Sequence, residues 1–111
     1  MVIIDVQRGG PSTGLPTKSE QTDLLLALYG RNGESPMPVI AALSPTDCFD
    51  AAYQAAKIAL EHLTPVILLT DAFIANGSGA WMLPTIETLD AIKPHYVTPE
   101  QKGHYTPYQR D

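Results

Sequence analysis

The sequence holds a single cysteine, Cys48, among its 111 residues. One thiol cannot build a disulfide framework, and it cannot supply the several thiolates of a zinc or iron–sulfur site within one chain. We therefore expect a reducing, cytoplasmic location. The sequon at Asn76 weighs little against this, because such triplets arise by chance and nothing in the sequence resembles a signal peptide.

Charged side chains are also scarce, at 17% of residues against the ~25% usual for a soluble domain. Seven Lys and Arg residues face twelve Asp and Glu residues, which gives a net charge of −5. The seven cations are scattered, so no basic stripe exists to neutralise phosphates, and this argues against nucleic-acid binding. Apolar residues make up 44%, which excludes disorder as the overall state.

No apolar run is long enough to cross a membrane, since the longest, Pro65–Leu69, falls far short of the ~20 residues required. Three short runs instead predict strands, at Val2–Val6, Val39–Leu43 and Val66–Leu69. None of them alternates polar with apolar residues. Continuous apolar runs of this length are typical of parallel strands that are buried on both faces.

A helix is predicted between the first two strands, from about Ser19 to Tyr29. Thr17 and Glu20 have the spacing of a capping box at its start. Gly30 is placed to be the left-handed residue just past its end.

A second helix is predicted after Ser44, the candidate N-cap, with Pro45 at the first helical position and Pro65 as its limit. Its predicted apolar face consists of Phe49, Ala52, Tyr53, Ala56, Ala59, Leu60 and Leu63. The order β-α-β-α-β predicts an α/β fold with a partial, doubly wound parallel sheet.

Two helices cannot cover both faces of three fully apolar strands. We therefore expect apolar surface that stays uncovered or is filled by another chain, and a fragment of a larger doubly wound domain; the alternative is a small autonomous three-stranded domain. The segment from residue 84 to 111 contains four prolines and predicts an extended exit linker, with at most a short helical turn at Ile86–Ile92.

The loop after the first strand carries the strongest chemical signal. Ligands of open parallel sheets bind beyond the carboxyl ends of the strands, where residues 5–17, the turn at Ser44 and residues 70–79 are expected to converge. Arg8 offers a planar cation for a carboxylate or phosphate, and free amides of the glycine-rich turn can form an anion nest. The loop residues assigned to this site are Gly9, Gly10, Ser12, Thr13 and Gly14. A rigid surface loop with a solvated arginine is the alternative.

Other motifs fail on particular positions. Gly9 and Gly14 have the spacing of a P-loop, but Leu15 stands where that motif needs lysine. Gly77 and Gly79 begin a dinucleotide fingerprint whose third glycine is replaced by Met82.

Single titratable residues are expected to be structural. Cys48 has no base partner, and the three histidines lack metal-ligand spacing, so no metal ligand is assigned. No catalytic residue is assigned either. Asp71 follows a buried strand and is expected to cap the amides of Gly77–Gly79.

The run from Asp5 to Lys18, DVQRGGPSTGLPTK, resembles the signature of the alpha subunit of 2-oxoacid:ferredoxin oxidoreductases, and most closely the 2-oxoglutarate-specific members. Residues 28–34, 64–71, 75–78 and 108–111 fit the same family. The resemblance covers nearly the whole chain.

This resemblance implies a thiamine-diphosphate-binding fold of the pyrimidine-domain type. Residues 1–83 would be the C-terminal half of a pyrimidine-binding domain, and residues 84–111 the exit linker. The implied activity is the oxidative decarboxylation of 2-oxoglutarate to succinyl-CoA, with electrons passed to ferredoxin. An arginine at the position of Arg8 binds the 2-oxoacid carboxylate in this family.

The family also implies which groups lie elsewhere. Thiamine diphosphate and Mg²⁺ would be held mostly by a beta subunit, and the iron–sulfur cluster and CoA elsewhere in a hetero-oligomer. The family's upstream loop and its activating glutamate are not among these 111 residues. We expect the chain alone to bind none of these cofactors and to be inactive. The competing hypotheses are a non-catalytic α/β assembly module that pairs with a partner subunit and a stand-alone anion-binding domain.

Overall fold

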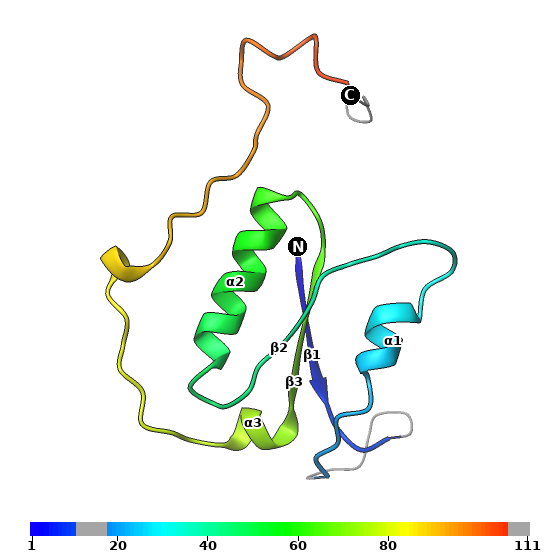
Figure 1. Ribbon diagram of the computed structural model, residues 1–111, viewed down its shortest axis with the longest axis vertical. Coiled ribbons are helices and arrows are strands. Elements are labelled where there is room, and N and C mark those ends of the chain that lie inside the picture. Colours follow the sequence, from blue (N-terminus) through cyan, green and yellow to red (C-terminus); the bar gives the residue numbers. More distant parts are fainter. Residues whose placement is uncertain (11–17, 107–111) are drawn as a thin grey trace.

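A three-stranded parallel sheet forms the centre of the computed structural model, which describes residues 1–10 and 18–106. Its strands are β1 (Val2–Gln7), β2 (Val39–Ala41) and β3 (Val66–Asp71), in the spatial order β1-β3-β2 (Figure 1). β1 and β3 pair in register over six residues, from Val2 opposite Val66 to Gln7 opposite Asp71. The predicted parallel strands are therefore confirmed.

The two connecting helices lie on opposite faces of this sheet. The chain crosses from β1 past β3 to β2 through α1 (Leu24–Tyr29), and returns to the middle through α2 (Cys48–Glu61). Right-handed crossovers in opposite directions place their helices on opposite faces, and Figure 1 shows α1 and α2 on the two sides of the strands. The doubly wound arrangement is confirmed.

Small side chains bring α2 close to the sheet. Ala51, Ala55 and Ala59 are its buried residues, and they pack around Val66 and Leu68 of β3. Of the predicted apolar face only Ala59 is among the buried residues; the other two, Ala51 and Ala55, lie one position before the predicted Ala52 and Ala56. In the structure the alanines give the close approach, while the larger apolar residues at the edges of that face stay partly exposed.

Apolar surface remains uncovered, as expected. In β1, Ile3 is 41% and Ile4 is 60% exposed. Successive side chains of a strand point to opposite faces, so β1 is open on both sides. In α1 only Ala27 is buried, whereas Leu24, Leu25 and Leu26 are exposed.

The first helix is shorter than predicted, and its two ends differ from the expectation. It begins at Leu24 instead of Ser19, because residues 18–23 run along the sheet edge without helical hydrogen bonds. Gly30 has φ −75°, so it is not left-handed. A Cβ atom at Gly30 would lie 2.5 Å from the carbonyl oxygen of Leu26, so glycine is required there for space. The capping-box residue Thr17 lies outside the described residues.

The second helix begins at Cys48, one turn later than predicted. Residues 45–47 form a turn in which the Ser44 hydroxyl accepts the N–H of Asp47 at 3.2 Å. The Asp47 carboxylate in turn accepts the N–H of Leu43 at 2.8 Å. Ser44 thus holds the approach to the helix, and Asp47 takes the N-cap position.

A third helix, α3 (Ala72–Asn76), stands where the sequence analysis expected a loop. Asp71 caps it: the Oδ1 atom accepts the N–H of Phe73 at 2.7 Å and that of Ile74 at 2.9 Å. The expectation that Asp71 caps Gly77–Gly79 is therefore wrong in its partners. An aspartate directly before a helix is a preferred N-cap, and that was the signal for α3.

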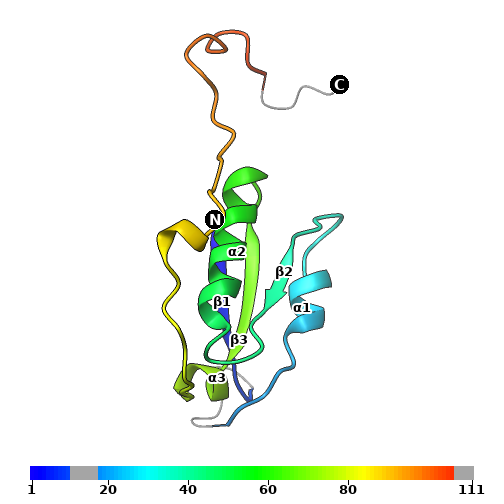
Figure 2. The ribbon, with the colours of Figure 1, turned by 60° about the vertical axis from the view of Figure 1, so that its left-hand side comes forward.

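The segment after α3 runs along the outside of α2 and then away from the sheet (Figures 1 and 2). Between residues 77 and 106, its one regular element is the 3₁₀ turn η1 (Ile86–Thr88), inside the range predicted for a short turn. The radius of gyration is 17.4 Å, against about 13 Å for a compact chain of this size. Within the described residues, no helix is long and apolar enough to cross a membrane.

Polar anchors on α2 hold this segment. Tyr53 donates its hydroxyl proton to the carbonyl oxygen of Asp90 at 2.6 Å, and Lys57 pairs with the Asp90 carboxylate at 2.8 Å. The N–H of Lys93 is donated to Glu61 at 3.0 Å. The hydrogen bond from Lys57 lowers the pKa of Asp90, and the same bond raises the pKa of Lys57.

We expect Lys57→Ala to free the segment around Asp90 without unfolding the sheet. The pair is at the surface, so its removal should shift the thermal midpoint little. Limited proteolysis between residues 84 and 106 should become faster, and added salt should produce the same effect in the unchanged protein. Lys93→Ala is the matched control, because only the backbone of Lys93 is anchored. Equal cleavage rates in both variants would show that the ion pair does not hold the segment.

Candidate functional site at the carboxyl ends of the strands

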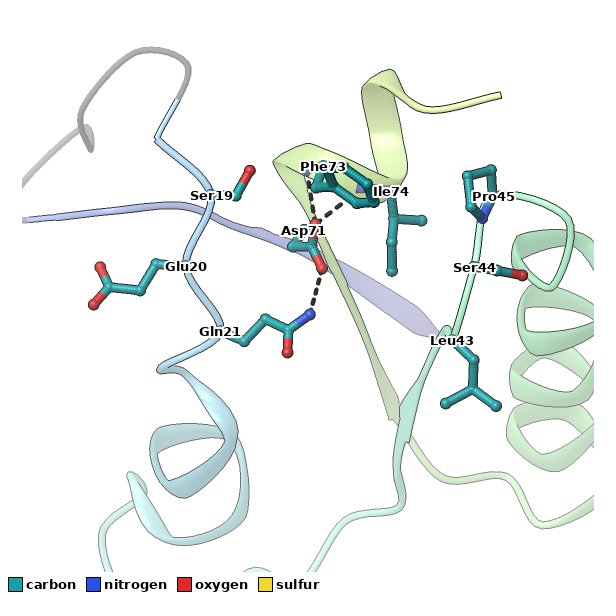
Figure 3. A pocket seen from close by; sticks show the side chains of 9 residues that line it. All are labelled: Ser19, Glu20, Gln21, Leu43, Ser44, Pro45, Asp71, Phe73 and Ile74. Atoms are coloured by element: carbon teal, nitrogen blue, oxygen red, sulfur yellow. Dashed lines mark hydrogen bonds between the residues drawn. The ribbon is translucent and has the colours of Figure 1, made fainter. Parts of the chain in front are cut away.

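The loops that follow the three strands meet at one edge of the sheet, as the topology predicts. They surround a cavity of ≈ 450 Å³ beside the ends of β2 and β3 (Figure 3). Its lining residues are Ser19, Glu20, Gln21, Leu43, Ser44, Pro45, Asp71, Phe73 and Ile74. A second cavity of ≈ 360 Å³ shares Gln21, Leu43, Asp71 and Ile74 with the first, so the two form one continuous depression.

Asp71 lies at the centre of this depression and is only 3% exposed. Its Oδ1 atom caps α3, whereas its Oδ2 atom accepts the side-chain amide of Gln21 at 2.6 Å (Figure 3). The hydrogen bond from Gln21, followed by that from the Ile74 backbone, lowers the pKa of Asp71. Asp71 is therefore a buried carboxylate that stays ionised at neutral pH.

Gln7, the last residue of β1, is 6% exposed and joins the strand ends to the returning loop. Its Nε2 donates to the carbonyl oxygen of Thr70 at 3.3 Å. Its Oε1 accepts the N–H of Asp23 at 3.0 Å. Both ends of this buried amide are satisfied, as a buried polar group requires.

The residues assigned to the anion loop have different surroundings. Arg8 follows β1 directly and is exposed. Gly9 is buried, and its N–H donates to the carbonyl oxygen of Lys18 at 2.8 Å, which closes the stem of the loop. Gly10 is exposed and has open space around it. Ser12, Thr13 and Gly14 lie outside the described residues.

The charge of the depression is negative. Glu20 and Asp71 line the larger cavity, and the described residues that line the two cavities include no lysine or arginine. Burial, and then the nearby charge of Asp23, raise the pKa of Asp5 in β1. The cavity itself therefore suits neutral or cationic groups, and Arg8 is the cation that follows the end of β1.

Cys48 makes a contact within the fold. The thiol of Cys48 donates to the carbonyl oxygen of Ser44 at 3.4 Å, within the turn before α2. Among residues 1–10 and 18–106, no three His, Cys, Asp or Glu side chains are grouped so that they could hold a metal ion.

Sequence reasoning missed Gln7 and Gln21. Gln7 carried a usable signal, because a polar residue at the end of a buried strand must find a buried partner. Gln21 carried none, since it was expected inside a helix and is instead part of the extended stem.

The comparisons with known proteins agree with the family resemblance of the Asp5–Lys18 run. The profile of the pyruvate flavodoxin/ferredoxin oxidoreductase family, thiamine-diphosphate-binding, matches residues 1–110. The 2-oxoglutarate oxidoreductase subunit KorA of Mycobacterium tuberculosis is 57% identical over 111 residues, 100% of this chain and 17% of the relative. The 2-oxoglutarate synthase subunit KorA of Archaeoglobus fulgidus is 37% identical over 93 residues, 84% of this chain and 27% of the relative.

A solved structure is also similar. It is a 2-oxoglutarate:ferredoxin oxidoreductase from Magnetococcus marinus with 2-oxoglutarate, coenzyme A and succinyl-CoA bound. The match has a TM-score of 0.63 and 46% sequence identity, and it covers 67% of this chain and 13% of that one. The 111 residues thus span about a sixth of the length of the Mycobacterium relative.

Proposed function

Because the chain belongs to the pyruvate flavodoxin/ferredoxin oxidoreductase family of thiamine-diphosphate-binding domains, we propose that it is part of the alpha subunit of a 2-oxoglutarate:ferredoxin oxidoreductase. The whole enzyme decarboxylates 2-oxoglutarate oxidatively to succinyl-CoA and passes the electrons to ferredoxin. The observation that carries this proposal is the 57% identity to the Mycobacterium subunit across all 111 residues.

Arg8 is the residue of this chain that binds substrate. A 2-oxoacid carboxylate presents two coplanar oxygens, which a guanidinium can meet with two parallel hydrogen bonds. The position of Arg8, exposed and one residue past the end of β1, supports this role. The exposed backbone of Gly10, with Ser12, Thr13 and Gly14 of the same loop, would form the edge of the anion site. Gly9, also assigned to this loop, closes its stem, because its N–H is donated to the carbonyl oxygen of Lys18.

The carbanion chemistry of the decarboxylation is supplied by thiamine diphosphate. The cavity at the strand ends fits one part of this cofactor and not the other. Its carboxylates at Glu20 and Asp71, with no lysine or arginine among the lining residues that the structure describes, disfavour a diphosphate. Its hydroxyl at Ser44, beside the apolar walls of Pro45 and Phe73, suits an uncharged heterocycle such as the aminopyrimidine.

As the family resemblance implies, the diphosphate and its Mg²⁺ would be held mostly by a beta subunit, and the iron–sulfur cluster and CoA by other parts of a cytoplasmic hetero-oligomer. The boundaries proposed for this chain are the C-terminal half of the pyrimidine-binding domain at residues 1–83 and the linker at residues 84–111. The open faces of β1 support a shared interface, since Ile3 and Ile4 leave apolar surface on both sides.

The same open surface favours the second candidate, a non-catalytic assembly module that only pairs with a partner subunit. Both candidates predict association, so association alone does not separate them. They differ in whether the assembled protein turns over a 2-oxoacid.

The deciding experiment is co-expression of the complete alpha subunit carrying this chain with its thiamine-diphosphate-binding beta subunit. We expect 2-oxoglutarate- and CoA-dependent reduction of ferredoxin or a viologen, with succinyl-CoA as product. The 111-residue chain alone should give none, because it spans 17% of the Mycobacterium relative's length. A complex that assembles with bound cofactor but oxidises no 2-oxoacid would favour the assembly module, and turnover by the chain alone would overturn the division of the site between subunits.

A further inference from the structure

The loop that carries Arg8 is tied to the sheet at both of its stems. On the outgoing stem, Gln7 is fixed by Thr70, and Gly9 donates its N–H to the carbonyl oxygen of Lys18. Arg8 therefore stands between two anchored neighbours. Its side chain is exposed, while its backbone has little freedom.

The returning stem, residues 18–23, contains the hydrogen-bond partners of Gly9 and of the Gln7 side-chain oxygen. It contains no regular secondary structure that could stiffen it. Two side-chain hydrogen bonds hold it instead: Gln7 accepts the N–H of Asp23 at 3.0 Å, and Gln21 donates to Asp71 at 2.6 Å. Lys18, whose carbonyl oxygen accepts the N–H of Gly9, belongs to this stem. Movement of the stem would therefore also move the hydrogen-bond partner of Gly9.

We propose that the Gln21–Asp71 hydrogen bond is a clamp that positions Arg8 for the substrate carboxylate, through residues 18–23 and the Gly9–Lys18 contact. Gln21 and Asp71 are positioning residues, since neither is assigned a contact with the substrate carboxylate. This inference rests on the proposed function, which assigns the carboxylate to Arg8.

The two carboxylate oxygens of Asp71 have different partners, so an effect on the position of Arg8 can be measured apart from an effect on folding. Oδ1 holds the N–H groups of Phe73 and Ile74 and so maintains α3. Oδ2 accepts Gln21, an exposed residue that contributes little to the core. If Asp71 served stability alone, loss of the Oδ2 contact would leave substrate binding unchanged. If the contact is a clamp, its loss weakens substrate binding.

Gln21→Ala in the complete enzyme tests the clamp. We expect KM for 2-oxoglutarate to rise roughly three- to tenfold with little change in kcat, because a loosened Arg8 weakens ground-state binding. Amide exchange at Gly9 and Asp23 should speed up, while exchange at Phe73 and Ile74 should not. Gln54→Ala, an exposed glutamine on α2, is the matched control and should change neither KM nor exchange.

Swapping donor and acceptor gives a sharper test. Asp71→Asn keeps an acceptor for the α3 cap, and its amide nitrogen can donate to Gln21 once the Gln21 amide turns to present its oxygen, so KM should stay near normal. Gln21→Glu alone places two carboxylates together, and KM should rise as in Gln21→Ala. The double substitution Asp71→Asn with Gln21→Glu reverses the polarity of the bond, and it should restore KM to within about twofold of the unchanged enzyme.

Combination with Arg8→Ala tells the clamp apart from the proposed function. If the clamp acts through Arg8, Gln21→Ala should have no further effect on KM once Arg8 is gone. If Arg8→Ala itself leaves KM unchanged, the assignment of the substrate carboxylate to Arg8 fails, yet the exchange measurements still report on the stem. If Arg8→Ala raises KM but Gln21→Ala changes neither KM nor exchange at Gly9, the clamp is overturned and the proposed function stands.

Discussion

Replacing Arg8 by lysine should lower kcat/KM for 2-oxoglutarate about ten- to a hundredfold, although the formal charge is kept. Guanidinium offers two parallel donors to a carboxylate, whereas ammonium is a point charge. Loss of a charge-assisted hydrogen bond in a closed site costs roughly 1.5–3 kcal/mol, which corresponds to this range. Much of the effect should be a raised KM, because the carboxylate is already bound in the ground state. Arg8→Ala should cost at least as much.

Steady-state kinetics of both variants in the reconstituted enzyme provide the measurement. Arg31→Lys is the matched control, because the Arg31 guanidinium is occupied at the end of α1, where it donates to the carbonyl oxygens of Ala27, Leu28 and Ser35. That change should lower the stability of α1 and leave KM unaltered. A solvated Arg8 without a substrate role predicts near-normal kcat/KM in both Arg8 variants, and such a result would refute the assignment.

The sheet could be predicted from sequence because its signal is local. Each strand is a continuous apolar run, and a run of that kind has few structural solutions other than a parallel strand. The lengths of the connections then made the neighbours parallel, and the handedness rule placed the helices. The expectation of uncovered apolar surface followed from counting strands against helices, and Ile3 and Ile4 confirm it.

The predicted start of α1 was wrong because tertiary hydrogen bonds outweigh a local helical preference there. Residues 19–23 have a helical pattern, but their polar groups are taken by Gln7 and Asp71, which lie 16 and 50 residues away from their partners. No local pattern contains such contacts. The same holds for the site: Arg8 could be chosen from its loop, but Gln21 could not.

The buried face predicted for α2 was wrong at most positions for another reason. Periodicity finds the face with the larger apolar side chains, whereas packing selects the face that comes closest to the sheet. Alanines at 51, 55 and 59 allow that approach. The larger residues on either side, among them Phe49 and Leu60, then stay partly exposed.

Asp71→Ala should lower the free energy of unfolding at pH 7 by about 1.5–3 kcal/mol. The change removes the N-cap of α3 and leaves the buried N–H of Ile74 without its acceptor. It also releases Gln21. Urea denaturation measures the loss, and Asp50→Ala, an exposed aspartate in the first turn of α2, is the control that should cost much less.

The contribution of Asp71 should also depend on pH, in a direction fixed by its hydrogen bonds. They lower its pKa below the ordinary 3.8, so the folded protein binds this proton less readily than the unfolded chain. The stabilisation is therefore complete above about pH 5, and it is lost as the pH falls through the lowered pKa. Asp71→Asn keeps the cap acceptor but has no charge to lose, so its stability deficit against the unchanged protein should shrink steadily below pH 4. If the two stability curves instead stay parallel down to the acid transition, the carboxylate is not preferentially ionised in the fold, and its bond to Gln21 is weaker than its length indicates.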